Sequence, residues 1–73
     1  MPKHALTRRN ARKIAMHMLN AMDEQRISEP VLAERLEVPL SEILPVLKGQ
    51  KLPTSSLMTK ISSVLGVSLG WLV

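Results

Sequence analysis

Apolar residues recur at helical spacing along the chain, and no stretch shows the alternation of apolar and polar residues that a β-strand requires. The longest pattern places apolar side chains at i, i+3, i+4, i+7, i+8 and i+11. It predicts an amphipathic helix from about Arg8 to Asp23, with Thr7 as its N-cap. Basic residues lie largely off the predicted buried stripe, which consists of Ala11, Ile14, Ala15, Met18, Leu19 and Met22.

Residues that begin or stop helices divide the remainder of the chain. Ser28 is a preferred N-cap residue, and Pro30 follows in the first turn, where no intrahelical N–H is needed. Pro39 ends this second helix near residue 36 or 37, because the residue before a proline leaves the α region. A third helical segment then covers about 40–48.

Glycines mark the ends of the third and fourth helices. Gly49 predicts a left-handed stop after the third helix. The fourth helix starts near Thr54 or Ser55 and ends before Gly66, and Ser68 caps a last short turn. We therefore predict a compact all-α domain of five short helices. It spans 1–73, with a basic segment and first helix at about 1–26, a helix pair at about 28–48 and C-terminal helices at about 54–73.

Composition excludes several classes of protein. Hydrophobic residues make up 45% of the 73 positions, so disorder from low hydrophobicity is excluded, and the length allows one domain. The chain has no cysteine and only two histidines, so we expect neither a metal nor a cofactor. A chain this short leaves little scaffold for a catalytic cleft, and we expect no enzyme. The uncharged runs are shorter than the roughly 20 residues of a spanning helix, and no apolar leader is present, which predicts a cytoplasmic protein without membrane contact.

The charge is unevenly distributed along the chain. The formal net charge is +4; residues 1–26 hold six basic and two acidic side chains, whereas residues 27–73 hold four of each. A basic front on a small domain indicates a polyanion partner. A cluster of charges that only keeps the chain in solution is the alternative, and charge alone does not separate the two.

Specific apolar, glycine and proline positions recur between Ser28 and Leu72. They are Leu32-Ala33-x-x-Leu36-x-Val38, Ile43, Val46, Gly49, Pro53, Leu57 and Ile61, and the most specific part is the ending Leu65-Gly66-Val67-Ser68-x-x-Trp71-Leu72. In this combination the chain resembles the Cro/cI-type helix-turn-helix family, also called the XRE family. The basic first helix stands where that family has its own first helix.

The resemblance implies a five-helix, lambda-repressor-like domain whose second and third helices form the helix-turn-helix. In such domains the third helix enters the major groove of double-stranded DNA, and its first residues meet base edges. Most members are repressors or related transcription regulators that bind palindromic operators as dimers. The resemblance implies DNA contacts at Arg8, Arg9, Arg12 and Lys13 in the first helix, at Ser41 and Glu42 in the third, and at Lys48, Gln50 and Lys51 after it.

The chain also departs from the family pattern. Glu29 stands where the family often has a glutamine that reaches the DNA backbone, and an acid there repels phosphate. Glu37 replaces the usual turn glycine, so either its φ is positive at some cost or the turn changes shape. Pro45 lacks the N–H that would bond to Ser41, and its ring would bend a regular third helix. A helix that starts only at Ser41 would place Pro45 near the first turn and reduce this clash.

Leucines replace polar residues in the third helix, at positions 40, 44 and 47. Together with Ile43 and Val46 they exceed what one short helix buries on one side, which predicts an apolar surface patch that includes Leu40 and Leu44. The alternative function is therefore a protein-interaction module on a helix-turn-helix scaffold, such as an antirepressor that docks a second regulatory protein. We favour DNA binding, because the resemblance and the basic front agree on it.

The C-terminal end carries more apolar side chains than its last turn needs for its own packing. Tryptophan is a favoured anchor at protein interfaces. The alternative is that Trp71 closes the core against the first and fourth helices. We predict a homodimer whose interface includes Leu69, Trp71, Leu72 and Val73.

Overall fold

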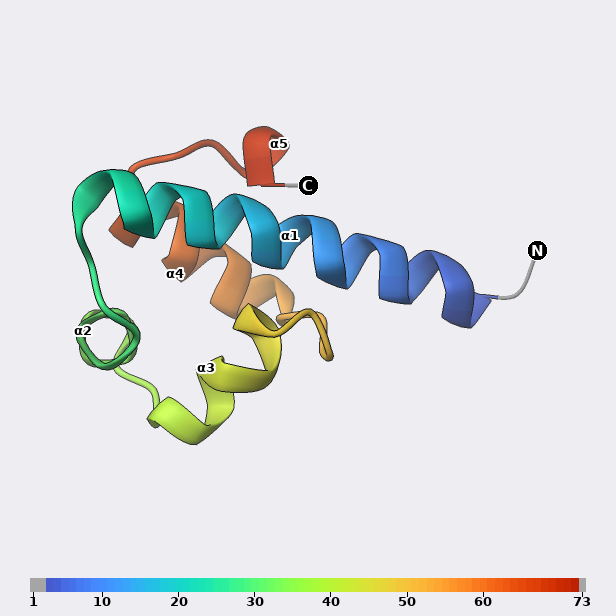
Figure 1. Cartoon of the computed structure of the whole chain (residues 1–73), viewed down its shortest axis with the longest axis horizontal. Helices are drawn as coiled ribbons and strands as arrows, with labels where there is room; N and C mark the ends of the chain where they lie inside the picture. The colour runs from blue at the N-terminus through green and yellow to red at the C-terminus, as the bar shows by residue number, and fades with distance from the viewer. Residues whose placement is uncertain (1–2, 73) are drawn as a thin grey trace.

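Five helices follow one another in the described part of the chain, with no strand among them (Figure 1). The computed structural model describes the backbone of residues 3–72 and the side chains of residues 9–72. The helices are α1 (Lys3–Gln25), α2 (Glu29–Leu36), α3 (Leu40–Leu47), α4 (Ser55–Leu65) and α5 (Leu69–Leu72). The prediction of an all-α globule with five helices is confirmed.

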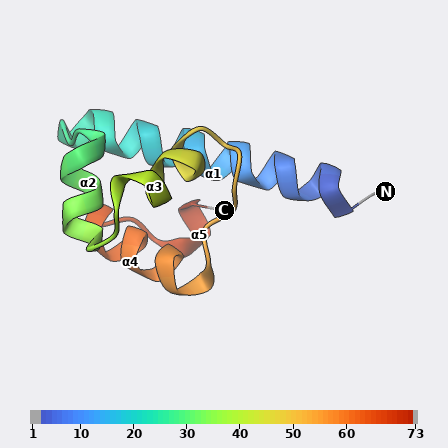
Figure 2. The ribbon, with the colours of Figure 1, turned by 90° about the horizontal axis from the view of Figure 1, so that it is seen from below.

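The first helix is longer than its amphipathic pattern. α1 begins at Lys3 and not near Arg8, so Thr7 lies inside the helix and the N-cap predicted there is wrong. A helix of 23 residues is about 35 Å long, close to the 37 Å long axis of the molecule. Its N-terminal turns extend beyond the other helices in both views (Figure 1 and Figure 2). In the part of the chain that the structure describes, no helix is both long enough and apolar enough to cross a membrane.

The later helices begin close to the predicted residues. α4 starts at Ser55, within the predicted range, and Thr54 caps it, because its Oγ1 accepts a hydrogen bond from the Leu57 N–H at 3.2 Å. Ser68 caps α5 in the same way and accepts from the Trp71 N–H at 3.1 Å. Ser28 stands directly before α2, but its side chain accepts no cap hydrogen bond.

The first four helices are each followed by a residue in the left-handed conformation. Gly49 after α3 has a φ of 72° and Gly66 after α4 a φ of 69°, which confirms both predicted glycine stops. Arg26 after α1 and Glu37 after α2 have φ values of 56° and 60°, although both carry side chains. Left-handed residues thus end these helices whether or not the sequence supplies a glycine.

Glu37 keeps the turn between α2 and α3 in the shape that a glycine gives. Its φ is 60° and its ψ is 39°, and the Val38 N–H reaches back to the Ala33 carbonyl at 3.1 Å. Such a bond across the left-handed residue is part of the Schellman arrangement at helix ends. Of the two possibilities left open by the sequence, the positive φ is the one adopted. The left-handed region costs a residue with a side chain about 1–2 kcal/mol.

The core lies between α1 on one side and α2, α3 and α4 on the other, and α5 closes it. α1 contacts α3, α4 and α5, while α2 packs against α3 and α4. The most deeply buried large side chains come from all five helices and are Met18, Leu32, Leu36, Ile43, Val46, Ile61 and Leu72. One part of the predicted α1 stripe is wrong: Leu19 is exposed, and Ala21 is buried instead.

Two side chains of α1 attach the C-terminal part of the chain. The Nδ1 atom of His17 lies 2.9 Å from the Leu72 carbonyl oxygen, within hydrogen-bonding distance. The His17 ring also packs on Trp71, with ring centroids 5.0 Å apart and an interplanar angle of 32°. Further along α1, the Gln25 side-chain amide donates to the Leu65 carbonyl at 2.6 Å. These contacts hold α5 and the end of α4 against α1.

Candidate nucleic-acid interface

One side of α3 is fixed in the core and the opposite side is open to solvent. Ile43, Val46 and Leu47 are buried, which anchors the helix against its neighbours. The residues on the other side follow helical spacing and form what we call the open face of α3, namely Ser41, Leu44, Pro45 and Lys48. Ser41 and Lys48 are exposed, and Leu44 and Pro45 are partly buried. The open face therefore offers one hydroxyl and one amine among apolar atoms.

Pro45 stands inside α3 and not in its first turn. The helix begins at Leu40, with Pro39 before it, so the start at Ser41 that would soften the clash is not adopted. Because Pro45 has no N–H, the Ser41 carbonyl lacks its usual donor four residues on. Ser41 is exposed, so water is able to donate to that carbonyl instead. After the proline, the Lys48 N–H again bonds to the Leu44 carbonyl at 3.0 Å.

Basic residues of α1 lie beside the end of α3. Arg9, Arg12 and Lys13 are exposed. Gly49 approaches the backbone of α1 so closely that a Cβ at this position would lie 3.1 Å from both Cα and Cγ of Arg12. Arg12, Lys48 and Gly49 consequently line one hollow. The structure thus brings together two cations that the sequence separates by 36 residues.

The loop after α3 continues along α1 before it reaches α4 (Figure 2). Leu52 in this loop lines a second hollow together with Asn10 and Lys13 of α1. The basic turns of α1 and the loop that carries Lys51 therefore belong to one side of the molecule. Gln50, also predicted to contact DNA, is exposed in this loop, and its N–H donates to the Pro45 carbonyl at 2.9 Å.

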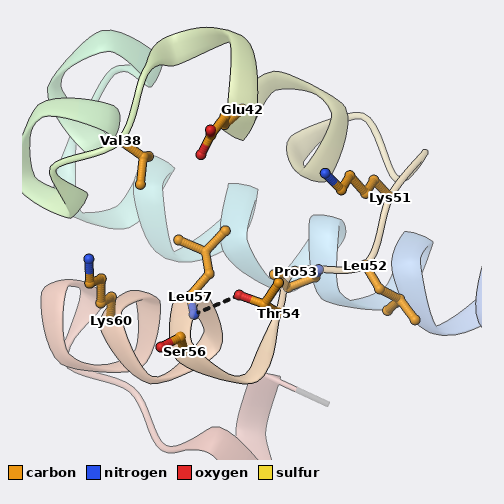
Figure 3. A pocket seen from close by; sticks show the side chains of 9 residues that line it. All are labelled: Val38, Glu42, Lys51, Leu52, Pro53, Thr54, Ser56, Leu57 and Lys60. Carbon is orange, nitrogen blue, oxygen red and sulfur yellow. Dashed lines mark hydrogen bonds between the residues drawn. The ribbon is translucent and has the colours of Figure 1, made fainter.

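Glu42 lies among lysines at the border of α3 and α4. It lines a hollow with Lys51 and Lys60, and the three charged groups point toward that hollow from different sides (Figure 3). The floor is apolar and includes Val38 and Leu57. Two amines near one carboxylate offset the repulsion that Glu42 alone exerts on a phosphate. Sequence reasoning missed Lys60, since nothing in its local pattern connects α4 with α3.

The predicted residues are not all gathered in one place. Ser41 lies two turns from Lys48 along α3, about 10 Å away, so it stands at the far end of the helix from Arg12. Glu29, predicted to repel phosphate, is exposed at the start of α2. The side chain of Arg8 and the whole of Val73 lie outside the described residues.

The predicted protein-interface residues divide between surface and core. Leu40 is exposed, and Leu69 and Trp71 are each 45% exposed. Leu72 is fully buried, so its side chain belongs to the core of the monomer and not to a surface, contrary to expectation. Trp71 packs on His17 but remains 45% exposed, so it both contacts α1 and leaves apolar surface open to solvent.

Comparisons of the chain with protein-family models, with curated proteins and with solved structures found no match. Within the described residues, no three histidine, aspartate or glutamate side chains lie close enough together to hold a metal ion.

Proposed function

We propose that the chain binds double-stranded DNA as a small transcription regulator, with α2 and α3 as a helix-turn-helix in a lambda-repressor-like domain. The observation that carries the proposal is the close approach of Gly49 to Arg12, which sets basic residues of α1 beside the C-terminal end of α3. The order of the five helices and the left-handed turn at Glu37 also support it. α3 has a solvent-exposed face beside these cations, as a helix that enters a groove requires.

Phosphate contacts supply most of the affinity in this proposal. The cations that can meet the backbone on one side of the molecule are Arg9, Arg12 and Lys13 of α1 with Lys48 and Lys51 after α3. Neutralising phosphates releases counterions, so affinity falls steeply as salt rises. Such contacts fix the position of α3 on the duplex but do not read its sequence.

Direct contacts with base edges are weaker than the phosphate contacts in this proposal. Direct readout depends mainly on arginine, lysine, asparagine and glutamine side chains. The open face of α3 has none of these before Lys48; Ser41 can donate or accept, and Leu44 can contact a thymine methyl group. We therefore propose that binding discriminates modestly between sequences.

The test is fluorescence anisotropy of a labelled random-sequence duplex at several salt concentrations. Five neutralised phosphates predict a log–log slope of about −4.5, and Arg12→Ala reduces its magnitude by about 0.9. Arg26→Asn is the matched control, because it removes one charge about 21 Å away along α1 and asparagine tolerates the left-handed conformation. The absence of a complex at low salt, or equal effects of the two variants, contradicts the proposal.

A protein-interaction module is the second candidate, favoured by the exposed Leu40 and the half-open Leu44. Leu40→Arg and Leu44→Gln distinguish the two functions once circular dichroism shows that both variants fold. If α3 serves DNA alone, both variants lower duplex affinity and leave any protein complex intact. If it serves a protein, they abolish that complex and leave duplex affinity equal or higher.

Self-association is part of the proposed function, because operators of the implied kind are palindromic. Leu69 and Trp71 are the exposed apolar residues of α5 that are available for it. Sedimentation velocity at micromolar concentration is expected to show a dimer, and Leu69→Lys is expected to return it to a monomer. A wild-type chain that stays monomeric at rising concentration refutes the dimer.

A further inference from the structure

The hollow beside Gly49 has an apolar centre that phosphate contacts do not use. Met16 and Leu19 are 55% and 45% exposed, an unusual degree for large apolar side chains one turn apart on a helix. Leu47, itself buried, lies at the same hollow from the α3 side. We call this feature the α1–α3 hollow. Exposed apolar side chains that line a concave surface are typical of a site that receives side chains from a partner.

The charges around the α1–α3 hollow have one sign. Arg12 and Lys48 line it from α1 and from the end of α3, and none of the described residues that line it is acidic. Arg9 is exposed on the same side of α1, seven residues before Met16. The acid on this side of α1 is Asp23, one turn beyond Leu19. The hollow is therefore cationic at one end and apolar in the middle, and it approaches a carboxylate at the other end.

We propose that the α1–α3 hollow binds an acidic amphipathic helix of another protein. Such a helix presents apolar side chains at i, i+3, i+4 and i+7 to a groove, and here they would contact Met16, Leu19 and Leu47. Its carboxylates would pair with Arg12 and Lys48, and with Arg9 beyond them. Charge complementarity also sets the orientation, because the acidic end avoids Asp23. A DNA duplex matches the cations but has no apolar anchors for Met16 and Leu19.

This partner would compete with DNA, a consequence that rests on the proposed function. Arg12 and Lys48 belong both to the proposed phosphate contacts and to the rim of the hollow. A carboxylate-rich helix on them occupies the positions that phosphates need, so the two ligands exclude each other. The partner would then release the regulator from DNA while contacting only Lys48 of the open face of α3.

The probe is a labelled 18-residue peptide with leucines at i, i+3, i+4, i+7 and i+11 and glutamates beside them, compared with a scrambled peptide of equal composition. Binding is measured by anisotropy, and its place by amide chemical shifts of residues 12–20 and 47–49. Met16→Gln and Leu19→Gln are expected to weaken the peptide about tenfold, the effect of losing one apolar anchor. Val31→Gln is the matched control, because Val31 is an exposed apolar residue of α2 that does not line the hollow.

The outcomes separate the two proposals. Peptide binding that weakens in Met16→Gln and Leu19→Gln but not in Val31→Gln supports the hollow, whether or not DNA binds. Equal binding of the scrambled peptide, no binding of either peptide, or indifference to Met16→Gln and Leu19→Gln overturns it. If the peptide binds and no duplex does at low salt, the proposed function fails and the inference stands.

Discussion

Replacing Gly49 by alanine tests the contact that joins the basic part of α1 to the end of α3. Gly49 has a φ of 72°, and a Cβ there would lie 3.1 Å from Cα and Cγ of Arg12 and 3.6 Å from its Cβ. Gly66 has nearly the same φ, 69°, but no heavy atom within 4 Å of the corresponding position. Gly70 has neither a positive φ nor such a neighbour. The three glycines therefore separate backbone strain from steric contact.

The expected free energies of unfolding follow from these environments. Gly66→Ala lowers stability by about 1 kcal/mol, because left-handed strain of about 1–2 kcal/mol is partly offset by the smaller chain entropy that alanine loses on folding. Gly49→Ala adds a contact with the backbone of α1, which cannot swing away as a side-chain end does. Overpacking of this kind costs roughly 1–3 kcal/mol more. Gly70→Ala lies in α5 and raises stability by about 0.5 kcal/mol.

Urea unfolding followed by circular dichroism measures these differences. The expected order of stability is Gly70→Ala, wild type, Gly66→Ala and Gly49→Ala, and each kcal/mol corresponds to about 4–8 °C in Tm for a chain of this size. If Gly49→Ala and Gly66→Ala agree within about 0.5 kcal/mol, the close approach to Arg12 does not exist. Arg12 then does not lie beside Lys48 either.

Three further predictions use the same measurement of stability or the single tryptophan. Glu37→Gly is expected to raise the free energy of unfolding by about 1 kcal/mol, since glycine removes the left-handed strain; no gain in urea midpoint contradicts it. Leu36→Ala is expected to lower it by about 2–5 kcal/mol through cavity formation, seen as a lower Tm, and an unchanged Tm contradicts the described core. His17→Ala is expected to loosen α5, seen as a red shift of Trp71 emission with little loss of helical ellipticity; an unchanged spectrum contradicts the contact between His17 and Trp71.

Most helix ends were predictable because their causes are local. Gly49 and Gly66 adopt the left-handed conformation that the sequence indicated, Ser68 accepts the N-cap hydrogen bond expected of it, and α4 starts at Ser55, within the predicted range. Each depends on a few neighbouring residues. The same locality explains the failure at Thr7, where a good capping residue lies inside a helix that continues to Lys3. A capping residue permits a helix to begin but does not force it to do so.

Burial was less predictable, because it depends on which neighbour covers each face. Leu19 fits the α1 stripe by spacing, yet it is exposed, whereas Leu47 of α3, which lines the same hollow, is buried. The candidate site likewise has features that were predictable from the sequence and features that were not. The basic character of α1 is visible in the sequence, whereas the approach of Gly49 to Arg12 joins residues 37 positions apart and has no local signal. Lys60 beside Glu42 is a similar case.

Under the proposed function, the composition of the open face of α3 limits how the protein selects its DNA sites. A good bidentate contact with a base discriminates by about 1–3 kcal/mol, and the side chains that make such contacts are missing before Lys48. Affinity from phosphates alone corresponds to nonspecific binding, with Kd values of about 10⁻⁴–10⁻⁶ M at physiological salt. Discrimination must then come from the spacing of two copies on a palindrome or from the deformability of the duplex. In the proposed function, the exposed Leu69 and Trp71 of α5 therefore matter as much to specificity as any residue of α3.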